Sequence, residues 1–287
     1  MSALILSLIS SLLVGFYIKY LKISTKRELF VFVFSNYVMA SFLTYYLFEL
    51  SISTIKFSIF DYKLVIFVSF LLPTVFYFLH KSLEFSGLAK TDIFQRLSLI
   101  IPIIFSFFLF NEEFSYIKAF VIVLTFISIF LILGKNSNNN LNKNHTNIFY
   151  LIAVFLGYGF VDTMFKLIAT NKDINFVELL FVIFVISAFI SLLYISFFKG
   201  KIDFKYLFFG LILGVLNFSN IYFYIKAHKI FAQTPTLVFI TMNLGVIIGG
   251  VIIGKYYFKE YLSKQAVLGI LLAIVCIVLL ALIQLKI

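Results

Sequence analysis

The sequence predicts an all-α integral membrane protein with ten transmembrane helices, arranged as two inverted five-helix repeats. Of the 287 residues, 63% are hydrophobic and 12% are charged, whereas a soluble domain has about half apolar and about 25% charged residues. Apolar runs of spanning length follow one another along the chain, and a short motif recurs at the end of each half. The composition excludes a water-soluble globule, and the spacing of the runs leaves no room for a sizeable soluble domain.

Ten apolar runs provide the predicted helices. Six contain at least eighteen residues without Asp, Glu, Lys or Arg, close to the roughly 20 residues that span a bilayer: 1–18, 29–48, 179–198, 206–225, 230–254 and 266–285. Four are shorter or interrupted and reach spanning length with their flanking turns: 64–80, 97–110, 119–134 and 148–169. The first run has no basic segment ahead of it, so we interpret it as a helix and not as a signal peptide.

The polar segment 135–147 lies at the middle of the chain, is rich in Asn and contains almost no apolar residue. Such a composition is typical of a linker. We therefore predict a first five-helix repeat over 1–134, a linker over 135–147 and a second five-helix repeat over 148–287.

A motif shared by the two halves supports the duplication. The sequence of residues 112–115, Glu-Glu-Phe-Ser, is matched 148 positions later by Glu-Tyr-Leu-Ser at 260–263, and Gly15-Phe16 with Lys22 is matched by Gly159-Phe160 with Lys166. An odd number of spans in each repeat places the two copies in opposite orientations. In transporters of this construction the substrate site lies between the copies, near the membrane midplane.

With these motifs the chain resembles two EamA domains of the drug/metabolite transporter superfamily. The resemblance is strongest at the end of each repeat, over residues 110–115 and 258–263, with Leu268-Gly269-Ile270 following the second copy. The first copy departs from the pattern, since Val121 stands opposite Gly269. The resemblance implies a monomeric, multi-pass protein of the inner or plasma membrane. It also implies a secondary transporter that moves small organic metabolites by alternating access, usually outward.

Polar side chains recur at helical spacing within three of the runs. Because an unsatisfied polar group in hydrocarbon costs several kcal/mol, such faces point toward protein or water. The faces comprise Ser69, Pro73, Tyr77, His80 and Glu84 in the third helix, Gln95, Ser98, Pro102 and Ser106 in the fourth, and Asn217, Asn220 and Tyr224 in the eighth. We expect them to line one cavity, with Tyr77, His80, Gln95, Asn217 and Asn220 as substrate contacts; the alternative is structural hydrogen bonding between helices.

The sixth helix contains the strongest single candidate for a functional site. Tyr158, Asp162 and Lys166 are spaced at four-residue steps, and Asp162 lies well inside the apolar run. An intramembrane carboxylate is costly and therefore points to a functional role, here a substrate contact or a proton carrier. The alternative is a structural ion pair with Lys166. Arg96, near the start of the fourth helix, is either an anion contact in the cavity or an interfacial anchor.

Other residues favour structural roles. Glu112, Glu113 and Glu260 are interpreted as loop charges that fix a turn, in preference to ion ligands. Small residues four apart predict close helix packing, and the pairs are Gly210 with Gly214, Gly245 with Gly249, and Gly250 with Gly254. Pro73 and Pro102 are expected to kink their helices, whereas Pro235 is expected to begin one.

The absence of several motifs narrows the function. No Gly-Lys pair is followed by Ser or Thr, so a phosphate-binding loop is missing and transport would not use ATP. The single cysteine, Cys276, and the three dispersed histidines make no metal or nucleophile motif. We therefore expect no enzyme, cofactor or metal; the alternative is a membrane-embedded enzyme that uses the Asp162 carboxylate.

The net charge of +11 comes from Lys and Arg that are scattered between the apolar runs, and this pattern disfavours a nucleic-acid surface. The expected partners are the lipid bilayer and a small-molecule metabolite, whose transport is optionally coupled to protons. The positive-inside rule applied to these charges places both termini outside the cytoplasm, whereas the resemblance implies termini inside. Both orientations stay open.

Overall fold

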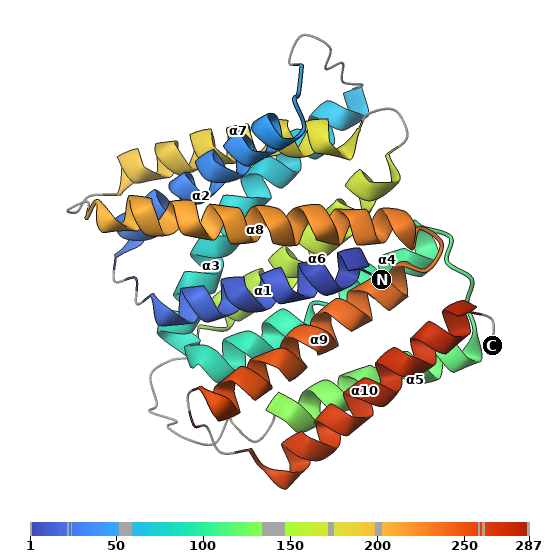
Figure 1. Cartoon of the computed structure of the whole chain (residues 1–287). Helices are drawn as coiled ribbons and strands as arrows, with labels where there is room; N and C mark the ends of the chain where they lie inside the picture. Colours follow the sequence, from blue (N-terminus) through green and yellow to red (C-terminus); the bar gives the residue numbers. More distant parts are fainter. Residues whose placement is uncertain are drawn as a thin grey trace. The chain divides into compact units, whose positions relative to one another are not determined.

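The computed structural model describes residues 2–21, 23, 25–51, 59–133, 147–171, 175–198, 203–257, 259 and 262–285. Over these residues the regular elements are α-helices (Figure 1). They are α1 (Ser2–Tyr20), α2 (Lys26–Leu47), α3 (Ile59–Leu97), α4 (Ile100–Phe108), α5 (Tyr116–Leu133), α6 (Ile148–Thr170), α7 (Phe176–Phe197), α8 (Lys205–Ile230), α9 (Pro235–Tyr256) and α10 (Lys264–Leu285). Among the described residues, nine helical segments are long and apolar enough to cross a membrane, and Ser2–Ile18 is a shorter apolar helix. The predicted all-α membrane protein is confirmed.

The long helix α3 contains two candidate spans and a break between them. The first span is Asp61–Gly87, and the second, Lys90–Phe108, continues through a turn into α4. At the break Gly87 has φ +78° and ψ 168°, a conformation that is almost restricted to glycine and costs other residues roughly 1–3 kcal/mol. The second span begins earlier than the apolar run at 97–110 predicts, because polar residues such as Lys90 and Asp92 form its first turns.

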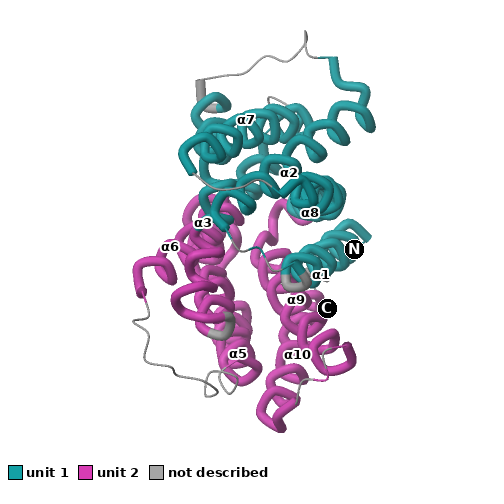
Figure 2. Tube along the Cα trace, turned by 90° about the vertical axis from the view of Figure 1, so that its left-hand side faces the viewer, with its two compact units in different colours: residues 1–77, 164–229 teal, residues 78–163, 230–287 magenta. Residues whose placement is uncertain are grey.

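The chain divides into two compact units (Figure 2). Unit 1 comprises Met1–Tyr77 and Met164–Lys229, and unit 2 comprises Phe78–Thr163 and Ile230–Ile287. Each unit therefore combines segments from both halves of the sequence. The predicted linker lies outside the described residues except for Asn147, whose side-chain oxygen accepts a hydrogen bond from the amide of Phe149 at the start of α6.

In unit 1, α2 packs between α7 and α8. A capping box between Thr25 and Glu28 begins α2. The ring of Phe30 stacks on Tyr194 of α7, with 4.5 Å between centroids. On the α8 side, a Cβ added to Gly210 would lie 2.4 Å from the carbonyl oxygen of Phe32. Glycine thus lets the backbones of α8 and α2 meet, and the packing role predicted for Gly210 and Gly214 is confirmed.

In unit 2, α10 packs along α5 and also contacts α9. The Ser128 hydroxyl of α5 donates to the carbonyl oxygen of Gly269 in α10 at 2.8 Å, and Cys276 is fully buried. Pro235 is the first residue of α9, as the sequence predicts. Gly250 differs from its prediction, because it is exposed and an added Cβ would meet no heavy atom within 4 Å. Close packing at Gly250 is therefore not found.

Candidate functional site

A cluster of four polar groups lies between α3 and α6 within unit 2. Tyr158 is close enough to Arg96, Asp162 and Asp92 to interact electrostatically with all three. Arg96 and Asp92, one turn apart on α3, form an ion pair with 3.3 Å between Nε and Oδ1. The four side chains are half-buried. The structure thus joins three predicted site residues, Tyr158, Asp162 and Arg96, and adds Asp92.

A close approach of two helices positions this cluster. Gly159, next to Tyr158 on α6, faces Ile101 of α4, and a Cβ added there would lie 2.4 Å from the Ile101 Cδ1 atom. The hydroxyl of Thr163 donates to the Gly159 carbonyl oxygen at 2.8 Å, so its hydrogen bond is satisfied within α6. The missing side chain of Gly159 lets α6 lie against the second span of α3 and α4.

The cluster combines two carboxylates, one guanidinium and one phenol inside candidate membrane spans. The guanidinium is permanently charged, whereas a carboxylate can accept a proton. Such a set can bind a polar or charged group of a small molecule, and the Asp162 carboxylate is chemically able to accept a proton. Ionisable groups within spans mark substrate or proton pathways in membrane proteins.

Lys166 belongs to the part of α6 that contributes to unit 1. Its side chain is fully buried, and its Nζ atom donates to the carbonyl oxygen of His228 at 3.4 Å. His228 lies in the last turn of α8, where a cation is favoured by the exposed carbonyl groups and the helix dipole. Lys166 therefore interacts with the C-terminal turn of α8, while its predicted pairing with Asp162 stays a prediction.

The two predicted asparagines of α8 bind other helices of unit 1. The Asn217 side chain donates to the side-chain oxygen of the buried Asn36 on α2 at 3.2 Å. The Ser7 hydroxyl of α1 lies 3.1 Å from both the carbonyl and side-chain oxygens of Asn220. These contacts match the structural alternative, hydrogen bonds between helices, and a role in substrate binding stays a prediction.

The remaining predicted residues lie on α3. In unit 1, the Tyr77 ring stacks on Phe30 at 6.1 Å between centroids, and the Lys26 ammonium is 5.8 Å from the Tyr77 centroid. In unit 2, His80 and Gln95 are half-buried. The single cavity that the three polar faces predict stays a prediction. Ser69, on the same face as Tyr77, donates to the Ile183 carbonyl oxygen of α7 at 3.3 Å.

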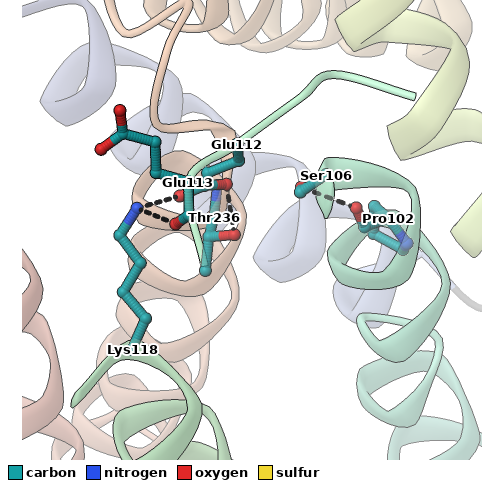
Figure 3. A network of polar contacts seen from close by, with 6 residues as sticks. All are labelled: Pro102, Ser106, Glu112, Glu113, Lys118 and Thr236. Carbon is teal, nitrogen blue, oxygen red and sulfur yellow. Dashed lines mark hydrogen bonds and ion pairs between the residues drawn. The ribbon is translucent and has the colours of Figure 1, made fainter. Parts of the chain in front are cut away.

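A second polar network surrounds Glu112, in the loop between α4 and α5 (Figure 3). One carboxylate oxygen accepts from the Lys118 ammonium at 3.2 Å. The other accepts from the amide and the hydroxyl of Thr236, at 3.0 and 2.6 Å. Glu112 thus fixes the turn, as the sequence predicts, and also reaches the start of α9. The matching Glu260 lies outside the described residues.

Sequence reasoning missed several members of these networks. Asp92 stands four residues before Arg96, a spacing that indicates a helical ion pair. Asn36 is a lone amide in the apolar run 29–48, the same signal that marks Asn217. Thr236 gives no local signal, because its partner is 124 positions away. Among the described residues, no group of three or more His, Cys, Asp or Glu side chains could hold a metal ion.

Comparison with known proteins relates the chain to a protein family, to a relative of similar sequence and to a solved structure of similar fold. Residues 1–134 match the EamA-like transporter family. An uncharacterised protein of Haemophilus influenzae (strain ATCC 51907 / DSM 11121 / KW20 / Rd) is 36% identical over 263 residues, which are 88% of this chain and 89% of that protein. A solved crystal structure is similar over 99% of both chains, with a TM-score of 0.74 and 12% sequence identity, which shows the fold alone.

The apolar helices and the family match define a multi-pass membrane protein of the transporter class. Residues 1–134 are an EamA-like domain, and this family is part of the drug/metabolite transporter superfamily.

Proposed function

We propose that the chain is a secondary transporter that exports small organic metabolites across the inner or plasma membrane by alternating access. The match of residues 1–134 to the EamA-like family supports transport as the activity. The observation that carries a site is the polar cluster of Tyr158, Asp162, Arg96 and Asp92 between two helices of unit 2. Intramembrane charges are too costly to be common without a function.

The proposed architecture is a monomer of ten spanning helices in two inverted five-helix repeats. Ser2–Ile18, the shorter apolar helix, would be the tenth span beside the nine longer candidates. The recurrence of Glu-x-x-Ser at 112–115 and 260–263 supports the duplication. In such a construction the two copies exchange inward-facing and outward-facing states around one site.

In this proposal Asp162 and Arg96 meet the polar groups of the substrate, and Tyr158 contributes a hydroxyl beside them. Asp162 would also carry a proton if transport is coupled to the proton gradient. Lys166, Tyr77, His80, Gln95, Asn217 and Asn220 are proposed as further substrate or coupling residues. The sequence contains no phosphate-binding loop, so the driving force would be an ion gradient or the gradient of the substrate.

Two measurements in sequence test this proposal. An untargeted comparison of metabolites inside and outside cells, with the gene deleted or overexpressed, identifies compounds whose export depends on the protein. Proteoliposomes containing the purified chain should then move the best candidate compound without nucleotide. Flux that appears only when ATP is added would contradict secondary transport. Flux that is indifferent to pH and membrane potential would exclude proton coupling and leave facilitated export.

A further inference from the structure

The first turn of α9 is held by a side chain from another part of unit 2. Thr234, the residue before the helix, makes no side-chain capping bond. The first amides of a helix have no intrahelical partner and need an acceptor. Glu112 supplies this acceptor, because its Oε2 atom receives both the amide and the hydroxyl of Thr236, the second residue of α9 (Figure 3). A carboxylate at this position also interacts favourably with the helix dipole.

Glu112 is also tied to α5 through its carboxylate and to α4 through its backbone amide. Its Oε1 atom accepts from Lys118 of α5, and the Lys118 ammonium also donates to the Glu113 carbonyl oxygen at 2.9 Å. The Glu112 amide donates to the Ser106 carbonyl oxygen of α4 at 3.0 Å. Glu112 therefore joins the ends of three helices, and its side chain is 1% exposed.

The surroundings of Glu112 are suited to opening. Of the loop residues 109–115, all of which the structure describes, Glu112 alone is buried. Asn111, directly before it, has φ +50°, which is uncommon for a residue other than glycine. A loop with so few buried contacts opens locally at a lower free energy than the helices around it. If Glu112 leaves, the first amides of α9 lose the cap that Thr234 does not provide.

From these contacts we propose that Glu112 is an electrostatic latch: it holds the first turn of α9 closed against the α4–α5 loop, and this turn opens to water when the latch is released. The device requires both partners. Lys118 neutralises the carboxylate inside the protein, and the two bonds from Thr236 to the carboxylate hold the first turn of α9 in place. Its opening is a local event within unit 2, and it can be measured whatever compound the protein transports.

Labelling of a buried cysteine measures this opening. Leu237, next to Thr236, is 3% exposed, so Leu237→Cys should react with a membrane-impermeant maleimide only when the turn opens. The native Cys276 is fully buried in α10 and serves as an internal control in the same molecule, since its labelling reports loosening of the unit as a whole. Mass spectrometry of the peptides separates the two sites.

In the Leu237→Cys background, Glu112→Gln should raise the labelling rate about tenfold or more, because the Gln amide group opposes the Lys118 ammonium, donor to donor. Lys118→Met should do the same by leaving the carboxylate without its counter-charge. Thr236→Val removes one of the two bonds to α9 and should give a smaller increase. The double variant Glu112→Gln with Lys118→Met should return toward the parent rate, since the Gln oxygen still accepts from Thr236 and no donor opposes its amide.

Glu113→Gln makes the same chemical change at the neighbouring, exposed residue, and it should leave labelling of Leu237→Cys unchanged. Two outcomes overturn the latch. In one, labelling of Leu237→Cys stays at the parent rate in both single variants. In the other, Cys276 becomes labelled in parallel with Leu237→Cys, so that Glu112 only supports the stability of the unit. Should Glu112→Gln not fold, the milder Thr236→Val decides between the same outcomes.

Discussion

Asp162 is the strongest single candidate for a functional residue. It is half-buried on α6 inside a candidate span, where an isolated central carboxylate costs about 2.5–3.5 kcal/mol on insertion scales. The Tyr158 hydroxyl and the Arg96 guanidinium lie in the same cluster, and a nearby guanidinium offsets part of that cost. A purely structural role would be served as well by apolar residues, so we expect the carboxylate to contribute to transport.

Replacing this carboxylate should therefore affect flux more than folding. We expect Asp162→Asn to lower transport in proteoliposomes by about tenfold or more, since a charge-assisted contact to the substrate or to a proton is lost. Asp203→Asn is the matched control. The side chain of Asp203, just before α8, is 43% exposed. Its hydrogen bond with Lys205 lowers the pKa of the carboxyl, so it is charged at neutral pH. Equal flux in the two variants would contradict a role for Asp162.

The pairing of Asp162 with Lys166 can be separated from their function by a double variant. Lys166→Met alone should reduce detergent thermal stability, because the Asp162 carboxylate would lose its predicted counter-charge. If the two charges form only a structural pair, Asp162→Asn with Lys166→Met should restore stability and flux together. We expect stability to recover and flux to stay low. Near-normal flux would retire Asp162 as a functional residue.

For single residues, the sequence predicted which side chains lie on a polar helix face better than it predicted their contact partners. The four-residue steps of Tyr158, Asp162 and Lys166 follow from the helix period, and the buried ionisable groups could be recognised from apolar neighbours alone. The acceptor of Lys166 on α8 could not be predicted, because every residue has a backbone carbonyl and the sequence does not show which one lies near Lys166. Thr236 was missed for the related reason that its partner, Glu112, belongs to a distant loop.

The positions of whole helices were predictable because a bilayer requires long apolar runs. The residues at which the helices begin and end were less predictable. The runs at 29–48 and 266–285 correspond to α2 and α10 within a few residues. The fourth span begins at Lys90 instead of 97, because a helix can continue through polar residues once its backbone bonds are made. The break at Gly87 depends on a single φ angle, which hydropathy does not encode.

Glycines on α8 allow a direct test of helix packing. We expect Gly210→Ala to destabilise the protein by roughly 1–3 kcal/mol, because the new Cβ would meet backbone oxygen of α2 and the helices must separate. Gly250→Ala, on the exposed side of α9, meets no atom and should be neutral or stabilising by about 0.5–1 kcal/mol through its higher helix propensity. Melting in detergent measures both. Equal effects would contradict the close approach of α8 and α2.

For the molecule as a whole, the two units cross the boundary between the predicted repeats. Unit 1 packs α2 from the first half against α7 and α8 from the second, and unit 2 packs α5 against α10. The sequence predicted the duplication from recurring motifs, but motifs do not say whether a helix packs within its own repeat or against the other copy. That information lies in contacts such as Asn36 with Asn217 and Ser128 with Gly269.

This mixing predicts how the chain responds to being divided. Cutting between residues 136 and 147 should be tolerated when both halves are co-expressed, because that segment reads as a solvated linker. Either half alone should be degraded, since α2 would lack α7 and α8, α5 would lack α10, and buried groups such as Asn36 would lose their partners. Co-purification through a tag on one half measures assembly. A matched cut after Gly157, inside α6, should abolish it. A half that is stable by itself, with cooperative melting in detergent, would contradict the exchange of helices between the two halves.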